Sequence, residues 1–147
     1  MWIRIPGAVA TVALSASLAA FPAVAAGQQD SAQADVQAWA GQWLYRATIE
    51  SGQMTGRITL ELTKGKLTGD MNEEGGGRRW RIDGVRVEHN RLTGIATQQG
   101  GALMPEGSVG NPEDYRVLEL QLKIEGDRFT GSLRARSLRG SIDGRRP

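Results

Sequence analysis

Few residues in this sequence have the types and spacing that catalysis requires. His89 is the only histidine, and the chain has no Cys. A general base needs an orienting partner and a nearby nucleophile, and residues 88–91 supply neither. The absence of Cys excludes disulfides, iron–sulfur clusters, thiolate zinc sites and a cysteine nucleophile. We therefore expect His89 to be a solvated turn residue, name no catalytic residue and favour a non-enzymatic protein.

Metal and phosphate sites find equally little support. Asp70, Glu73, Glu74 and Asp83 are acidic enough for weak Ca²⁺ binding, but they lack the spacing of an EF-hand. The glycine-rich segment 75–79 has neither the Lys-Ser/Thr pair nor the following helix of a phosphate loop. We expect the carboxylates to be solvated, the glycines to form a hairpin tip, and the protein to need no metal or cofactor.

Three aromatic residues are candidates for a ligand cavity. The alternation of apolar and polar residues predicts that Trp43, Tyr45 and Trp80 point inward. Large aromatic side chains either fill the interior of a small barrel or line a pocket. Core filling is the commoner use, and both remain open at this point.

The segment 98–114 is the best candidate for contact with a partner. A connection of this length is uncommon and is usually functional or disordered. It carries the apolar Leu103 and Met104 together with the acidic Glu106 and Asp114. Such a segment either covers the mouth of a barrel, docks into a partner, or serves as a disordered connector.

Arg134 and Arg136 share an outward parity and belong to a locally basic C-terminus. They form either a solvated face or a basic stripe for an acidic partner or lipopolysaccharide. Nucleic acid is not expected as a partner, because no aromatic residues are interleaved with the basic ones.

The elements that position these residues are strands. Alternation with one apolar and one polar face is typical of antiparallel sheets, and segments rich in Gly, Asn and Asp supply the turns between them. We predict eight strands, at residues 41–49, 54–62, 67–71, 79–87, 92–97, 115–124, 129–135 and 138–143. A change of parity within the fourth strand predicts a bulge at Asp83 and Gly84.

Glycine accounts for 20 of the 147 residues, about twice its average share. Five of the glycines recur at the start of strands with an inward parity, where they would let a strand coil sharply as a barrel closes: Gly56, Gly69, Gly94, Gly131 and Gly140. The predicted fold is an all-β, antiparallel up-and-down β-barrel of about eight strands. A two-sheet β-sandwich is the alternative, since alternation alone does not separate the two.

Residues 1–26 have the pattern of a secretory signal peptide. Arg4 gives a positive n-region, an Ala-rich apolar stretch follows, and small residues near Ala25 and Ala26 suit cleavage. We predict a periplasmic or extracellular protein without stable membrane insertion after cleavage. Residues 27–40 are expected to form a lead or a short helix from about residue 30 to 39, and residues 41–147 a single barrel domain.

Gly41, Gln42 and Trp43 open the first predicted strand, and Arg139, Arg145 and Arg146 lie near the chain end. This pattern resembles that of calycins, the lipocalin and avidin type of barrel, in which an arginine from the last strand packs over the tryptophan of a G-x-W motif. The resemblance implies an eight-stranded barrel with an apolar ligand cavity. It also implies that Trp43 is covered by Arg139 or Arg145.

Three functions follow from these patterns. The leading hypothesis is a secreted or periplasmic barrel that binds a small hydrophobic ligand. The second is a periplasmic interaction module, such as an inhibitor or an accessory subunit. The third is a barrel-type isomerase or cyclase. The volume and lining of the barrel interior would separate them best.

Overall fold

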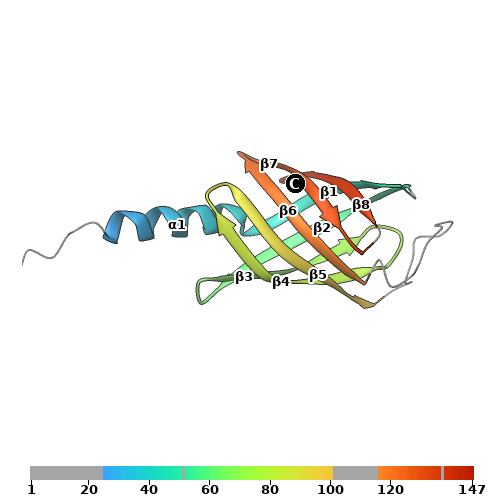
Figure 1. Cartoon of the computed structure of the whole chain (residues 1–147), viewed down its shortest axis with the longest axis horizontal. Helices are drawn as coiled ribbons and strands as arrows, with labels where there is room; N and C mark the ends of the chain where they lie inside the picture. The colour runs from blue at the N-terminus through green and yellow to red at the C-terminus, as the bar shows by residue number, and fades with distance from the viewer. Residues whose placement is uncertain (1–24, 51, 101–115, 137) are drawn as a thin grey trace, which may run out of the picture.

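Eight strands and one helix make up the part of the chain that the computed structural model describes, residues 25–50, 52–100, 116–136 and 138–147. The helix is α1 (Ala25–Trp39). The strands are β1 (Gly41–Ile49), β2 (Gly52–Thr63), β3 (Lys66–Glu73), β4 (Arg79–Glu88), β5 (Arg91–Gly100), β6 (Val117–Glu125), β7 (Arg128–Arg134) and β8 (Arg139–Arg145) (Figure 1).

The strands form one closed antiparallel barrel in chain order. Each strand pairs with the next, and β8 pairs with β1 through residues such as Ala47 and Ile142. The up-and-down barrel predicted from the alternation is confirmed, and the two-sheet sandwich is excluded. Closure leaves no long free edge in the ring, which is the main hazard of an exposed sheet.

The apolar residues of the alternating pattern point into the barrel core, and the polar residues point to the surface. In β6, Leu118, Leu120 and Leu122 are buried, whereas the intervening polar side chains are exposed. Burial of the inward faces removes apolar area from water, which stabilises the fold by roughly 25 cal/mol per Å².

The barrel has two different ends. The turns that follow β2, β4 and β6 lie at the same end as α1, which we call the closed end. The connections that follow β1, β3, β5 and β7 lie at the opposite end, which we call the open end (Figure 1). This division matters because the aromatic and polar residues of the interior separate between the two ends.

Close approach of neighbouring backbones explains most of the inward glycines. A Cβ atom at Gly56 would overlap the carbonyl oxygen of Asn72, and one at Gly131 would overlap that of Gln121. Gly69 and Gly140 are equally tight, whereas a Cβ at Gly94 would make ordinary contacts. Close approach of a neighbouring strand therefore requires glycine at four of the five positions.

The predicted bulge in β4 is present. The register between β4 and β5 shifts between Asp83 and Arg86, and Gly84 has a φ of +63°. Beyond this point β4 no longer pairs with β3, since their ladder runs only from Gly69 opposite Ile82 to Asn72 opposite Arg79.

Several boundaries differ from expectation, among them that of β3, which runs to Glu73 instead of ending at residue 71. The helix begins at Ala25, earlier than the expected residue 30. Strand β5 continues to Gly100, so the first residues of the expected connection 98–114 belong to a strand. Within the described ranges, no helix is long and apolar enough to cross a membrane.

Candidate functional site

Aromatic residues plug the closed end of the barrel. The rings of Trp39, Trp43 and Phe129 lie with their centroids 5.6 to 6.2 Å apart. The indole Nε1–H of Trp43 donates to the carbonyl oxygen of Trp39 at 2.9 Å, which ties the end of α1 to β1. These three side chains are almost fully buried, so Trp43 belongs to a packed core.

An arginine covers this plug. The Arg146 guanidinium lies 4.0 Å from the centroid of the Trp43 ring, a cation–π contact. Its Nη1 donates to the carbonyl oxygen of Ala40 at 2.8 Å, and its Nη2 donates to that of Ala38 at 2.6 Å. The expectation that Arg139 or Arg145 covers Trp43 is wrong. Both of those arginines are exposed in β8, whereas Arg146 follows the strand end and folds over the barrel.

A polar group lies in the interior towards the open end. The Arg78 side chain is 1% exposed and forms a two-pronged ion pair with Glu73. Its Nε donates to Glu73 Oε2 at 2.6 Å, and its Nη2 donates to Glu73 Oε1. The guanidinium also lies 5.6 Å from the centroid of the Trp80 ring. Two-pronged pairing of this kind fixes the orientation of the guanidinium.

The local sequence explains how Arg78 reaches Glu73. The turn between β3 and β4 contains Gly75 and Gly77, whose φ values of +84° and +68° suit glycine. The backbone N–H of Glu73 donates to the carbonyl oxygen of Arg78 at 2.9 Å and closes the turn. Both side chains have the inward parity, as do Met71 and Trp80 on the same strands.

Tyr45 joins this group because glycine leaves room for its ring. In the register, Tyr45 lies opposite Gly56, which in turn lies opposite Glu73. A Cβ atom at Gly56 would come within 2.9 Å of Tyr45 Cε1. The phenol ring therefore lies along the bare backbone of β2. We refer to Tyr45, Glu73, Arg78 and Trp80 as the inner polar cluster.

Two hydrogen-bond donors of the inner polar cluster have no partner among the described residues. They are the Tyr45 hydroxyl and Arg78 Nη1, and both atoms are buried. Burial raises the pKa of the Tyr45 phenol and the Glu73 carboxylate raises it further, while Arg78 lowers it. The phenol thus stays protonated and can donate. Leaving a buried donor unpaired costs about 1–3 kcal/mol.

The chemistry available to the cluster is recognition of an acceptor oxygen. A carboxylate, sulfonate, phenolate or carbonyl oxygen within hydrogen-bond reach of either donor would satisfy it. Glu73 is already engaged by Arg78, so it is not a free base. The arrangement favours binding over acid–base catalysis.

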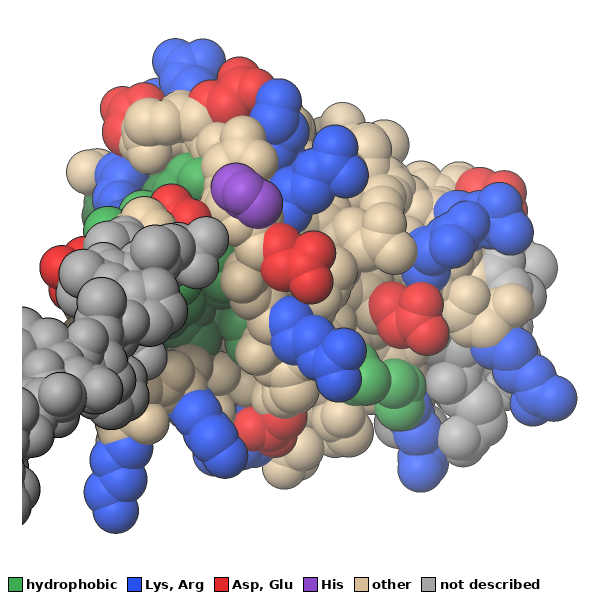
Figure 2. Space-filling view, turned by 60° about the vertical axis from the view of Figure 1, so that its left-hand side comes forward, with side chains coloured by type: hydrophobic (Ala, Val, Ile, Leu, Met, Phe, Trp, Pro, Cys, Tyr) green, Lys and Arg blue, Asp and Glu red, His purple; other side chains and the backbone are tan. Residues whose placement is uncertain are grey.

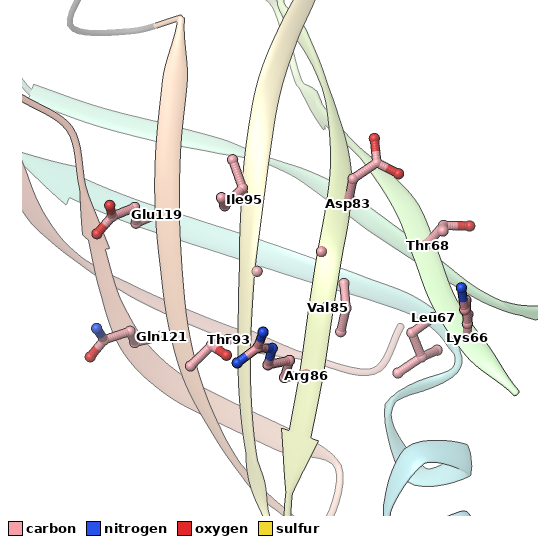
Figure 3. Close-up of a pocket in the computed structure, with 12 residues that line it drawn as sticks. Lys66, Leu67, Thr68, Asp83, Val85, Arg86, Thr93, Ile95, Glu119 and Gln121 are labelled. Carbon is pink, nitrogen blue, oxygen red and sulfur yellow. The ribbon is translucent and has the colours of Figure 1, made fainter.

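A groove of about 760 Å³ lies on the outer wall where β3 and β4 separate (Figure 3). Leu67 and Val85 contribute apolar surface there, and Ile95 is 46% exposed beside them. Lys66, Asp83, Arg86 and Glu119 mix both signs of charge around it. This open groove contains none of the buried donors.

The structure separates the residues proposed from the sequence. Tyr45 and Trp80 belong to the inner polar cluster, whereas Trp43 belongs to the plug at the other end. Arg134, Arg136 and the turn residue His89 are exposed. Leu103, Met104, Glu106 and Asp114 lie outside the described residues. Groups of three or more metal-ligating side chains are not found within the described ranges.

The sequence interpretation missed Glu73 and Arg78. Glu73 was expected to be solvated and Arg78 to belong to a hairpin tip, but the Arg78 side chain is buried and the Glu73 side chain is only 10% exposed. The available signal was parity: Glu73 follows Met71 by two residues, and Arg78 precedes Trp80 by two. Opposite charges with inward parity on both sides of a short turn predict an interior ion pair.

Comparisons with known proteins support the fold. No protein-family model and no curated protein matches the sequence. The chain is similar to a solved structure of a redesigned β-barrel, mFAP1, bound to DFHBI. The TM-score is 0.53 at 15% identity, with 76% of this chain and 98% of that chain covered. A second similar structure is a de novo designed fluorescence-activating β-barrel, with a TM-score of 0.49, 16% identity, and coverage of 76% and 95%. The chain is thus a small antiparallel eight-stranded barrel; membership of the calycin families stays a resemblance.

Proposed function

We propose that this protein is a binding module that takes a small amphipathic ligand at its open end. The observation that carries the proposal is the pair of buried donors, the Tyr45 hydroxyl and Arg78 Nη1, that lack an acceptor among the described residues. An acceptor group of the ligand would supply the missing partner of these donors. The ligand is therefore apolar in its body and carries a carboxylate, sulfonate, phenolate or carbonyl group.

Apolar residues support the hydrophobic part of the proposal. Ile49, Met54 and Leu138 are buried at the strand ends nearest the open end, and Leu118 is buried near the start of β6. Side chains fill the interior from the plug upward, including Ile58, Leu120 and Leu133. The proposed ligand site is consequently shallow and lies near the open end, and it does not extend through the length of the barrel.

The fold likeness is compatible with this function. mFAP1 is a barrel of the same size class that was solved with the small molecule DFHBI bound. It supports the physical point that a barrel of about this length holds a small molecule. The identity of the ligand of this chain rests on its own side chains.

We also propose that the protein is exported and that residues 1–26 are removed as a signal peptide. The support is the sequence pattern of a positive n-region, an apolar stretch and small residues before the cleavage point. N-terminal sequencing of the mature protein should begin at Ala26 or Gly27. An intact Met1 in the exported fraction would refute the cleavage.

Native mass spectrometry tests the binding function. The protein purified gently from its expressing cell should carry a small-molecule adduct, and solvent extraction should release an amphipathic compound with an acceptor oxygen. Refolding after extraction gives the matched ligand-free control. Persistent absence of an adduct, together with no binding of added fatty acids or arylsulfonates to the refolded protein, would refute the proposal.

A further inference from the structure

Like charges face each other twice across the outer wall formed by β7 and β8. Arg128 lies directly opposite Arg145, and Arg134 lies directly opposite Arg139. All four side chains are exposed. Like charges at directly opposed positions destabilise a sheet, so the barrel tolerates two unfavourable pairs in one ladder.

Acidic residues compensate these arginines only in part: on the other side of β7, Glu125 of β6 lies opposite Arg128, and Glu119 lies opposite Arg134. The ion pairs among the described residues on other outer strands join Arg81 to Asp83 at 3.2 Å and Lys123 to Glu125 at 2.6 Å. None of the ion pairs found in the described ranges includes an arginine of β7 or β8. The two strands together contain one acidic residue, Asp143. In the space-filling view of Figure 2, blue basic side chains and red acidic side chains are interspersed over the face that is shown.

The arginine pairs extend along the barrel. Arg128 and Arg134 are six residues apart on one strand, which corresponds to about 20 Å. At the open-end pair, a groove of about 490 Å³ has three arginines, one glutamate and two apolar residues in its lining: Arg134, Arg136, Arg139, Glu119, Val117 and Ala135. Val117 is 47% exposed and is one of two large apolar side chains exposed within the described ranges.

We propose that this outer wall docks onto the surface of an anionic membrane, with the arginine pairs holding phosphate oxygens of the lipid headgroups. Guanidinium pairs suit phosphate because they offer several N–H donors in a fixed geometry. A bilayer presents phosphates along the full 20 Å or so of the row, so both pairs are filled at once. A single small anion reaches only one pair. The exposed Val117 beside the arginines suits the boundary between headgroups and acyl chains.

Nucleic acid fits the wall less well. Single-stranded nucleic acid needs aromatic side chains for stacking, and the large apolar side chains exposed in the described ranges are Val117 and Ile95. The proposal is independent of the ligand site, since the inner polar cluster faces the interior and β7–β8 face outward.

Co-sedimentation with lipid vesicles tests this proposal. The wild-type protein should bind vesicles of phosphatidylglycerol and phosphatidylcholine, should not bind phosphatidylcholine alone, and should dissociate as the salt concentration rises. The double variant Arg134→Gln/Arg139→Gln should bind about thirtyfold more weakly. The matched control Arg86→Gln/Arg91→Gln removes the same charge from two exposed arginines of β4 and β5 and should retain binding within about threefold.

Other outcomes of the vesicle experiment distinguish a membrane surface from other anionic partners. Equal losses in both double variants would overturn the proposal in favour of unspecific attraction by net charge. Full competition by millimolar inorganic phosphate, or binding of polyglutamate in place of vesicles, would also overturn it. Thermal unfolding checks the variants: Arg134→Gln removes a repulsive pair with Arg139 and a favourable pair with Glu119, so its unfolding temperature should stay close to that of the wild type.

Discussion

Tyr45 is the residue at which stability and binding oppose each other. Its ring is buried against Gly56, yet its hydroxyl lacks a partner among the described residues. Phenylalanine would fill the same space without an unpaired donor. The Tyr45 hydroxyl is therefore better explained by ligand binding than by packing. Residues of binding sites are commonly less stabilising than the best packing alternative.

Replacement Tyr45→Phe should raise the free energy of unfolding of the ligand-free protein by about 1 kcal/mol, because it removes an unsatisfied buried polar group. Urea unfolding followed by Trp fluorescence measures this. Replacement of the exposed Thr48 by Val is the control for a neutral change on the same strand. A clear loss of stability in Tyr45→Phe would mean that the hydroxyl has a partner in solution.

The ionisation of Tyr45 predicts an alkaline signature. The free phenol ionises near pH 10, and in the fold its pKa is raised, first by burial and then by Glu73. Above pH 10 the unfolded chain loses this proton while the native state keeps it, so the stability of the fold falls as pH rises. The advantage of Tyr45→Phe over the wild type should grow by up to about 1.4 kcal/mol per pH unit above pH 10. An unchanged difference between pH 9 and pH 11 would contradict the raised pKa.

The Arg78–Glu73 pair gives a second prediction at this scale. Arg78→Met leaves the Glu73 carboxylate without its partner and should destabilise the fold by about 3–5 kcal/mol. The double variant Glu73→Leu/Arg78→Met removes both charges and should recover most of that loss. Chemical denaturation of the wild type, the two single variants Arg78→Met and Glu73→Leu, and the double variant gives the coupling energy between the residues. Additive losses would show that the pair is not formed in solution.

At the scale of elements, the end of α1 is attached to the barrel through Arg146. Its contacts with the carbonyl oxygens of Ala38 and Ala40 and with the Trp43 ring join the helix end, β1 and the chain end. The last four carbonyl groups of a helix lack partners within it, so an arginine at this position satisfies groups that water or another side chain would otherwise have to meet.

Arg146→Met should destabilise the protein by about 2 kcal/mol, since two hydrogen bonds from a charged donor and one cation–π contact are lost. Arg145→Met is the matched control because the neighbouring side chain is exposed on the outer wall, and it should change stability by less than about 0.5 kcal/mol. Thermal unfolding compares the two. Equal effects would show that the stacking on Trp43 contributes nothing beyond the removal of a charge.

The elements were also the part that the sequence predicted best. Alternation gave all eight strands, the bulge at Asp83 was visible as a change of parity, and the closed barrel followed from strand number and inward glycines. Which arginine covers Trp43 was predicted wrongly, because the parity of β8 ends with Arg145 and the chain turns over the barrel only at Arg146. The ion pair of Glu73 and Arg78 was not predicted, because charged residues beside glycines in a turn usually indicate a solvated hairpin tip. Parity of charged residues is as informative as parity of apolar ones.

At the scale of the whole molecule, the two ends and the outer wall have different tasks. The closed end is filled by Trp39, Trp43 and Phe129 and gives a rigid base. The half towards the open end holds the inner polar cluster, where the ligand is proposed to bind. The basic wall of β7 and β8 is proposed to hold the barrel at a membrane surface. A barrel that binds a small amphiphile beside a membrane would be well placed to exchange it with the lipid phase.

The central claim is that a ligand binds at the inner polar cluster. Isothermal titration calorimetry of the folded protein with the anionic apolar probe 1-anilinonaphthalene-8-sulfonate tests this claim most directly. The account predicts one site in the wild type and about fivefold weaker binding in Tyr45→Phe, the loss expected for one hydrogen bond, despite the greater stability of that variant. Thr48→Val should bind as the wild type does. Unchanged affinity in Tyr45→Phe, or no binding to the folded wild type, would contradict a ligand site at the inner polar cluster.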